Sequence, residues 1–211
     1  RSRFSAMDFL AAQKLLRDRE RIWEHPEEIY SVIENTASSF VRERDGRIEI
    51  LASSMDWFQE AWGRDTFISL PGILLATGRY EDAKSSIIDL SGLIKNGLIP
   101  NRVRNTQDPS AIEYNTVDAS LWFIQSVKKY MEYTGEKEFV RSVLPAMRTI
   151  ISAYMSGTGY QRYGRFNRIY MDTDGLIVSP SQATWMDADP GGQDRPVTPR
   201  NGKAVEINAL W

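Results

Sequence analysis

The chain has 211 residues, 42% of them hydrophobic and 26% charged, which is enough for one sizeable hydrophobic core or two small ones. Its formal net charge is −2, from 26 basic and 28 acidic residues, so no basic excess exists to bind nucleic acid or an anionic membrane surface. The absence of cysteine and the single histidine exclude disulfides, thiol nucleophiles, zinc–thiolate sites and multi-histidine metal sites, and no apolar run is long enough to cross a membrane.

Apolar residues recur at helical spacing along most of the chain and predict an all-α fold. The pattern is clearest between Leu121 and Met131, where apolar side chains are three or four positions apart. Short strands are expected at 47–51 and around the Asp174–Gly175 turn, inside the longer connections. The predicted helices lie near 5–23, 27–43, 65–77, 80–95, 117–133 and 136–156, with a further helix that begins near 203.

Short and long connections alternate between these helices. The short ones are 24–26, 77–79 and 134–136. The long ones are about 45–64, 96–116 and 157–202. Because a short link forces two helices to run antiparallel, the long connections gather at the opposite end of each pair. This arrangement predicts an α/α toroid, a ring of helical hairpins with a loop-lined pit at one mouth; a helical solenoid is the alternative.

The predicted helices fill only part of such a ring. The chain supplies three hairpins and the start of a fourth. A closed ring of six hairpins needs roughly 280 residues, from about twelve helices and their connections. We therefore expect residues 1–211 to form part of one domain that is truncated on its C-terminal side, with the remainder of a parent polypeptide as its partner.

The first candidate site lies in WFQEAWGRDTF (57–67), where Trp62, Arg64 and Asp65 are nearly adjacent. Asp65 at the start of a predicted helix has a simple structural explanation as its N-cap. Capping leaves Arg64 and Trp62 unexplained, whereas fixed donors and acceptors beside an aromatic face suit a sugar. The residues alone leave saccharide binding and a capped helix as equal alternatives.

The second candidate site is EYNTVDASLWF (113–123). Asn115 or Thr116 can cap the helix that follows, and Asp118 lies in its first turn, where an acidic residue is favourable to the helix dipole. This structural explanation is sufficient by itself. Only the expected position on the same rim as Arg64 argues for a binding role, in which Asn115 and Asp118 hold further hydroxyls.

The third candidate site begins with Asp187, which follows Trp185 in a long loop that contains no helix start to cap. A loop aspartate is normally solvated, but the neighbouring tryptophan favours a partly desolvated site. Arg200 and Glu206 flank the next helix start, where Glu206 also suits the helix dipole. Carboxylates, arginines and tryptophans in three loops, without a metal set or a phosphate-binding motif, suit glycoside hydrolysis by two carboxylates.

Five motifs resemble, in the same order, the C-terminal domain of glycogen debranching enzymes, the amylo-α-1,6-glucosidase part. They are WGRDTFISLPGILLATGR, GLIPNR, YNTVDASLWF, TWMDA and TPRNGKAVEINALW. The resemblance runs from about Trp57 to Trp211 and departs from the family pattern at SMDWF (54–58), where a Pro-Trp-Phe-like lead-in is expected. It implies part of an (α/α)6 barrel with short β-hairpins in its long loops. It also implies an inverting hydrolase that removes the single α-1,6-linked glucose from a trimmed branch of glycogen or a limit dextrin.

The resemblance also implies roles for individual residues. Asp187, in the Thr-Trp-Met-Asp motif, is the expected general acid. By similarity to an aromatic-x-Arg-Asp element of glucoamylases, Arg64 and Asp65 bind glucose hydroxyls and Trp62 lines the pocket. Matching motif positions imply substrate binding by Asn115, Asp118, Trp185, Arg200 and Glu206. The family's catalytic base lies later in the domain, beyond Trp211, so we expect this chain alone to have no glucosidase activity.

Two other functions stay open. One is a different exo-acting glycosidase of the same fold, such as a glucoamylase-like or processing α-glucosidase. The other is a non-catalytic helical module that binds glucan or a protein partner. A branched α-glucan is the expected partner, with no cofactor, nucleic acid or membrane. We expect a cytoplasmic protein, because the sequence has no cysteine and no Asn-x-Ser/Thr sequon.

Overall fold

The computed structural model describes residues 26–51, 60–192 and 195–211. The helix predicted at 5–23 and the SMDWF segment lie outside these ranges. The chain divides into two compact units, one that ends at Ser39 and one that begins at Phe40, and each is considered by itself. Within the described residues the second unit is mainly helical and carries three small antiparallel sheets.

The elements are short, and their bounds follow in chain order. The helices are α2 (Pro26–Ser39), α3 (Gly63–Leu70), α4 (Tyr80–Ser91), α5 (Ala119–Thr134), α6 (Lys137–Ser156) and α7 (Val205–Leu210), with a π-helical turn η1 (Pro71–Leu75) that continues α3 and a 3₁₀ turn η2 (Pro109–Ala111). The strands are β1 (Val41–Arg44), β2 (Arg47–Ile50), β3 (Ala61–Trp62), β4 (Arg102–Val103), β5 (Ile112–Glu113), β6 (Thr158–Arg162), β7 (Arg165–Met171) and β8 (Ile177–Val178).

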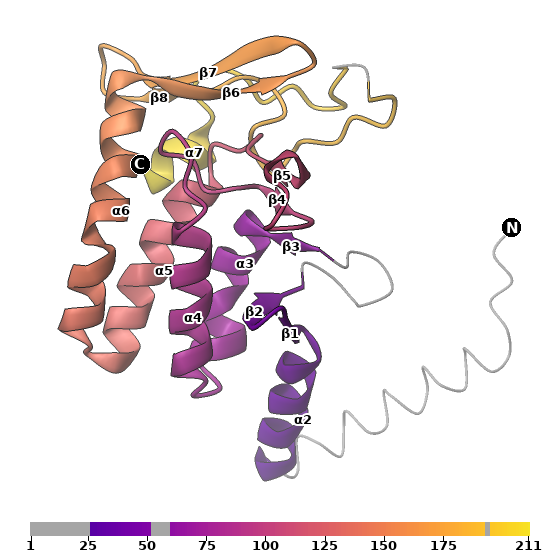
Figure 1. Ribbon diagram of the computed structural model, residues 1–211, viewed down its shortest axis with the longest axis vertical. Helices are drawn as coiled ribbons and strands as arrows, with labels where there is room; N and C mark the ends of the chain where they lie inside the picture. The colour runs from indigo at the N-terminus through magenta and orange to yellow at the C-terminus, as the bar shows by residue number, and fades with distance from the viewer. Residues whose placement is uncertain (1–25, 52–59, 193–194) are drawn as a thin grey trace, which may run out of the picture. The chain divides into compact units, whose positions relative to one another are not determined.

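Helices α3 to α6 form two antiparallel pairs, α3 with α4 and α5 with α6 (Figure 1). The short link of each pair contains a glycine in the left-handed region, Gly78 at φ +75° and Gly135 at φ +69°, a conformation that glycine adopts without strain. Both links lie at one end of the helices, while the connections after α4 and after α6 leave from the opposite end (Figure 1). The predicted alternation of short and long connections is therefore confirmed for these two pairs.

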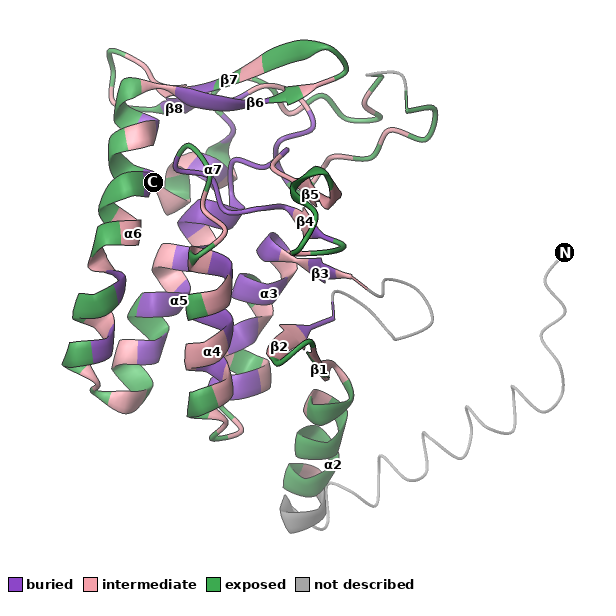
Figure 2. Cartoon of the chain, in the orientation of Figure 1, coloured by how far each residue is buried: buried purple, intermediate pink, exposed green. Residues whose placement is uncertain are grey.

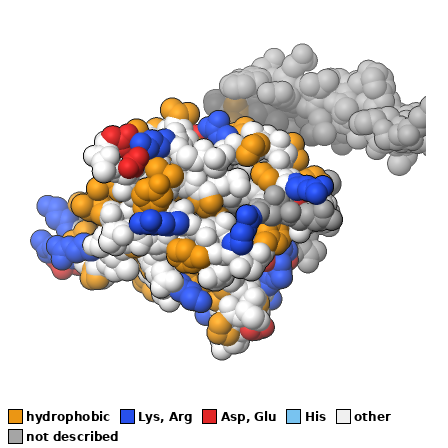
Figure 3. Space-filling model, turned by 90° about the horizontal axis from the view of Figure 1, so that it is seen from above, with side chains coloured by type: hydrophobic (Ala, Val, Ile, Leu, Met, Phe, Trp, Pro, Cys, Tyr) orange, Lys and Arg blue, Asp and Glu red, His pale blue; other side chains and the backbone are white. Residues whose placement is uncertain are grey.

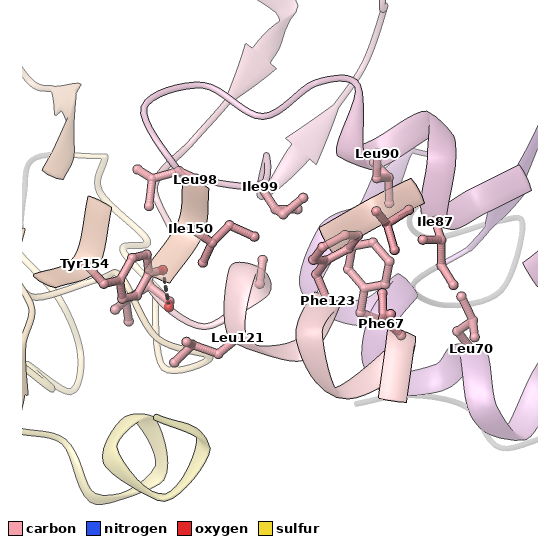
Figure 4. Packing of buried hydrophobic residues seen from close by; sticks show 14 of the residues in the cluster. Phe67, Leu70, Ile87, Leu90, Leu98, Ile99, Leu121, Phe123, Ile150 and Tyr154 are labelled. Atoms are coloured by element: carbon pink, nitrogen blue, oxygen red, sulfur yellow. Dashed lines mark hydrogen bonds between the residues drawn. The ribbon is translucent and has the colours of Figure 1, made fainter. Parts of the chain in front are cut away.

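The hydrophobic core lies between these helices (Figure 4). Phe67 of α3 and Phe123 of α5 pack edge to face, with ring centroids 5.3 Å apart. Tyr154 of α6 is buried, and its hydroxyl donates to the carbonyl of Val117 at 2.7 Å (Figure 4). Buried residues line the facing sides of α3, α4 and α5, whereas α6 has a largely exposed outer side (Figure 2). The core thus fixes the ends of the helices from which the long connections leave.

The helix predicted at 27–43 is wrong in its last turn. Helix α2 ends at Ser39, and β1 follows and pairs antiparallel with β2. Asp45 and Gly46 form the turn between the two strands, with φ of +52° and +74°. Because Asp-Gly is a preferred two-residue hairpin turn, the strands on both sides outcompete the helix. The strand predicted at 47–51 is confirmed, and α4 ends at Ser91, earlier than predicted.

The connection predicted as a long loop at 157–202 contains the three-stranded antiparallel sheet β6–β7–β8. The chain returns from β7 to β8 around Gly175, which confirms the strands predicted there. Lys203 holds this return in place, because its ammonium group lies 2.7 Å from both Asp172 and Asp174. The sheet lies across the end of the helices from which the long connections leave (Figure 1).

Helix α2 is the described part of the first unit. Tyr30, Val32 and Ile33 are exposed on it. The hydroxyl of Thr36 donates to the carbonyl of Val32 one turn earlier, at 2.7 Å. Neither α2 nor any other helix in the part of the chain that the structure describes is long and apolar enough to cross a bilayer.

Candidate active site

Arg64 lies in the first turn of α3 and is buried, with 6% of its surface exposed. The three-stranded sheet β3–β4–β5 precedes and flanks this turn. The backbone N–H of Gly63 donates to the carbonyl of Asn101 at 2.9 Å, which places the start of α3 against the connection between α4 and α5. An arginine in this position must be balanced by acidic groups, because an unpaired buried charge is strongly unfavourable.

Gly63 permits this close approach of two backbone segments. A Cβ atom at Gly63 would lie 2.1 Å from the carbonyl oxygen of Pro100. We expect Gly63→Ala to lower the free energy of unfolding, measured by urea denaturation, by about 2–3 kcal/mol, because the backbone must move apart. Gly72→Ala is the matched control: a Cβ at Gly72 meets nothing within 4 Å, and alanine favours a helix. Equal losses in the two variants would contradict this explanation.

Asp118 is the principal partner of Arg64. One carboxylate oxygen of Asp118 accepts from Arg64 Nε at 2.7 Å, and the other accepts from the Thr116 hydroxyl at 2.7 Å. The oxygen of Thr116 in turn accepts from the backbone N–H of Ala119 at 3.1 Å. Thr116 therefore caps α5, although Asp118 occupies the N-cap position. The predicted cap by Thr116 is confirmed, and the helix dipole alone does not explain Asp118, since its carboxylate accepts a hydrogen bond from Arg64 of α3.

Asp187 approaches Arg64 from a third segment, between β8 and α7. Arg64 Nη1 donates to Asp187 Oδ2 at 3.3 Å. Two contacts hold this segment in place. The backbone N–H of Val117 donates to the carbonyl of Ala183 at 2.7 Å, and Gln182 Nε2 donates to the carbonyl of Asp187 at 3.3 Å. The structure thus brings together one predicted residue from each of the three candidate sites.

We refer to Arg64, Asp118 and Asp187 as the Arg64 cluster. Burial by itself lowers the pKa of Arg64, but the charges and hydrogen bonds of Asp118 and Asp187 outweigh burial and raise that pKa above its ordinary value. The two carboxylates differ in access: the side chain of Asp118 is 3% exposed and that of Asp187 is 28% exposed. Asp118 is therefore an internal anchor for the cation, whereas Asp187 is the carboxylate that a ligand can reach.

Asp65 adjoins the Arg64 cluster. Helix α3 begins at Gly63 and its N-cap position is Trp62, so the predicted capping role of Asp65 is wrong. The pKa of the Asp65 carboxyl is raised above its ordinary value, chiefly because the residue is largely buried. Arg64 and a backbone hydrogen bond oppose this rise, and the negative charges of Asp187 and Asp118 add to it. Asp65 therefore shares the electrostatic environment of the cluster.

Each of the two predicted aromatic residues precedes a member of the cluster by two positions in sequence, but their environments differ. Trp62, on β3, is partly buried and lies under the guanidinium group of Arg102, with 5.1 Å between its centre and the ring centroid. Trp185 is 58% exposed, whereas the side chain of Asp187 is 28% exposed and thus partly buried. Asn115 is buried in the wall of a cavity beside α5.

Arg200 and Glu206 form an ion pair with each other at the start of α7. Arg200 Nε donates to Glu206 Oε1 at 3.0 Å, and a second contact joins Arg200 Nη2 to Glu206 Oε2. The hydrogen bonds that Arg200 donates to Glu206 raise the pKa of Arg200 and lower the pKa of Glu206. Within the described residues the hydrogen bonds of these two side chains join them to each other and not to the Arg64 cluster.

Residues 34–211 match the family described as amylo-alpha-1,6-glucosidase. The chain belongs to this family. It is 33% identical over 202 residues to the glycogen debranching enzyme of Saccharomyces cerevisiae, in a match that covers 72% of this chain and 13% of the yeast enzyme. The resemblance inferred from the five motifs is confirmed, and the chain spans a small part of the length of this relative.

This member of the amylo-α-1,6-glucosidase family places two further residues beside the cluster that the sequence did not predict. Tyr160 of β6 is 6% exposed, and burial raises the pKa of its hydroxyl to about 12. The positive charges of Arg162 and Arg64 oppose this increase, and the negative charge of Asp187 adds to it. The side-chain amide of Gln182 donates to the backbone carbonyl of Asp187. The backbone of Gln182 itself is in the left-handed region, at φ +59°. Neither residue belongs to a local pattern that indicates its position.

The acidic residues of this family member do not form a metal centre in the part that the structure describes. No group of three or more histidine or acidic side chains there is arranged to hold a metal ion. In the Arg64 cluster one guanidinium group pairs with two carboxylates.

Proposed function

We propose that this chain forms the glucose-binding side of an α-1,6-glucosidase site and supplies its general acid, Asp187. The observation that carries the proposal is the convergence of Arg64, Asp118 and Asp187 from three separate segments, in a chain of the amylo-α-1,6-glucosidase family. Asp187 is the more accessible of the two carboxylates that contact Arg64. A protonated Asp187 transfers its proton to the glycosidic oxygen as the bond to glucose breaks.

Arg64 has two roles in this proposal. Its bond to buried Asp118 fixes the guanidinium group, and its contact with Asp187 positions the acid. The contact with Asp187 is long, at 3.3 Å, so a glucose hydroxyl can replace it and release Asp187 to the glycosidic oxygen. Asp65 and Asn115 bind further hydroxyls.

The catalytic base is proposed to come from a segment outside these 211 residues. Inversion requires a second carboxylate roughly 6.5–9.5 Å from the acid, so that a water molecule fits between them. Asp118 does not meet this need because both of its oxygens accept hydrogen bonds, from Arg64 and Thr116. We propose that the chain is part of an (α/α)6 barrel whose other helices carry the base. The 211-residue chain alone is then expected to release no glucose.

The proposal can be tested with the full polypeptide that carries this chain, by measuring which glycosidic linkage it cleaves and which anomer of glucose it releases. We expect hydrolysis of an α-1,6-linked glucose on a maltooligosaccharide, with β-glucose as the first product seen by proton NMR, because inversion changes the anomeric configuration. Comparable hydrolysis of α-1,4-linked ends indicates the glucoamylase-like alternative. Binding of branched dextrin without release of glucose indicates a non-catalytic module.

A further inference from the structure

Gln182 has an unusual backbone conformation for a buried residue. Among the described residues, four that are not glycine have a positive φ: Asp45, Asn96, Tyr163 and Gln182. The first three are exposed, and each directly precedes a glycine in a turn. Gln182 is 1% exposed, has φ +59° and precedes Ala183. Because a glutamine is strained in the left-handed region, its surroundings must hold it there.

The side chain of Gln182 shows what this strained turn achieves. Its Nε2 donates to the backbone carbonyl of Asp187 at 3.3 Å, so a buried amide joins the two ends of segment 182–187. A buried amide needs a hydrogen-bond partner, and the Asp187 carbonyl is the partner of Nε2 within the described residues. The turn therefore spends backbone strain at the residue that contacts the candidate acid, as is common near functional sites.

The two residues that follow Gln182 anchor the turn from below. Ala183 and Thr184 are fully buried. The Ala183 carbonyl accepts from the backbone N–H of Val117 at 2.7 Å, directly before the N-cap of α5. The Thr184 hydroxyl accepts from the backbone N–H of Met186 at 3.3 Å. The turn is thus fixed to the start of α5, and Gln182 transmits this fixed position to Asp187.

The carboxylate of Asp187 has less support than its backbone. Within the described residues it accepts one hydrogen bond, from Arg64 Nη1 at 3.3 Å. Its segment belongs to the end of the molecule seen in Figure 3, where acidic side chains are few among Lys, Arg and hydrophobic ones. When a glucose hydroxyl replaces Asp187 on Arg64, the carboxyl group loses that contact. The backbone contact from Gln182 then remains to direct the acid toward the glycosidic oxygen.

We propose that Gln182 is a positioning residue, which holds the backbone of Asp187 fixed while Arg64 exchanges Asp187 for a glucose hydroxyl. The inference rests on the proposed function of Asp187. Because Gln182 contacts the acid and not the substrate, its contribution is confined to proton transfer to the leaving oxygen. Its loss therefore lowers kcat and leaves KM, and only for a leaving group that needs a proton.

The experiment gives the full polypeptide two substrates, a maltooligosaccharide with one α-1,6-linked glucose and α-glucosyl fluoride. The sugar oxygen needs a proton to leave, whereas fluoride leaves as an anion. Gln182→Met keeps the length of the side chain and removes its donor. We expect kcat for the branched substrate to fall roughly 10- to 100-fold, with its KM and the kcat for the fluoride within about threefold. The same change at an exposed glutamine, Gln107→Met, should leave all three values within about twofold.

A second variant covers the case in which Gln182→Met does not fold. Asparagine tolerates the left-handed region better than glutamine, but its amide is one methylene too short to reach the Asp187 carbonyl. Gln182→Asn is therefore expected to fold, with an unchanged circular dichroism spectrum, and to show the same loss on the branched substrate alone. Equal losses on both substrates, or full kcat on the branched one, would overturn the positioning role.

Asp187→Asn, measured in parallel, separates this inference from the proposed function. It should show the same dependence on the leaving group to a larger degree. If Asp187→Asn loses turnover of the branched substrate and the folded Gln182 variants do not, the role of Gln182 fails and the proposed function stands. If Asp187→Asn keeps full turnover, Asp187 is not the acid, and both fail together.

Discussion

Replacing Asp187 with Asn in the full polypeptide is expected to lower the rate of glucose release from a branched limit dextrin by about 10³-fold. The amide keeps the shape of the side chain and its position beside Arg64, but it has no acidic proton to transfer to the glycosidic oxygen. Because Asp187 is partly exposed and its carboxylate has one long contact, binding of the dextrin should change much less than turnover. Single-turnover glucose release and equilibrium binding measure the two effects separately.

Asp189→Asn provides the control for that experiment. It makes the same chemical change two residues further along the same loop, at a carboxylate that accepts from the Tyr163 hydroxyl at 3.1 Å. We expect turnover to stay within about threefold of the unmodified value, as for most substitutions outside a site. Turnover by Asp187→Asn at the level of Asp189→Asn would remove Asp187 from the role of general acid.

Replacing Asp118 with Ala is expected to lower the free energy of unfolding by about 3–5 kcal/mol, measured by chemical denaturation. The substitution leaves the buried Arg64 guanidinium with only its long contact to Asp187, and a buried charge that loses its partner is strongly destabilising. Asp82→Ala is the matched control. It breaks the partly exposed pair between Arg79 and Asp82, which lies at 2.6 Å, and should cost less than about 1 kcal/mol.

A double variant separates stability from function at the same position. Because an apolar pair of similar volume often replaces a buried ion pair without loss, Arg64→Met with Asp118→Leu is expected to recover most of the stability that Asp118→Ala loses. Glucose release by the double variant should be abolished, since neither new side chain can position Asp187 or bind a hydroxyl. A double variant as active as the unmodified polypeptide would show that the pair serves only the fold.

The helices of the second unit were predictable because their signals are local. Apolar spacing predicted α5 and α6 within about two residues at each end, and Gly135 marked the link between them. The same argument placed the long connections at one end of the helices, which is why Arg64, Asp118 and Asp187 were expected on one rim. Their actual contacts required the fold, because hydrogen bonds across 54 and 123 residues have no local pattern.

Other features depended on competition between local signals or on distant neighbours. The last turn of the helix predicted at 27–43 was wrong because the Asp45–Gly46 turn favours a hairpin over a continued helix. Trp185 is exposed whereas Asp187 is partly buried, because burial is set by what packs over a loop and not by its neighbours in sequence. Tyr160 was missed because a single tyrosine in a short strand carries no sign of which charges lie near it.

Thr116 joins two events that are separate in many proteins. A single hydroxyl donates to the Asp118 carboxylate and receives the first backbone N–H of α5. Nucleation of that helix and orientation of the anion that holds Arg64 therefore occur together. If the first turn of α5 frays, the arrangement of these charged groups is lost as well. Partially unfolded forms of this unit are therefore expected not to bind ligand, even where they retain other secondary structure.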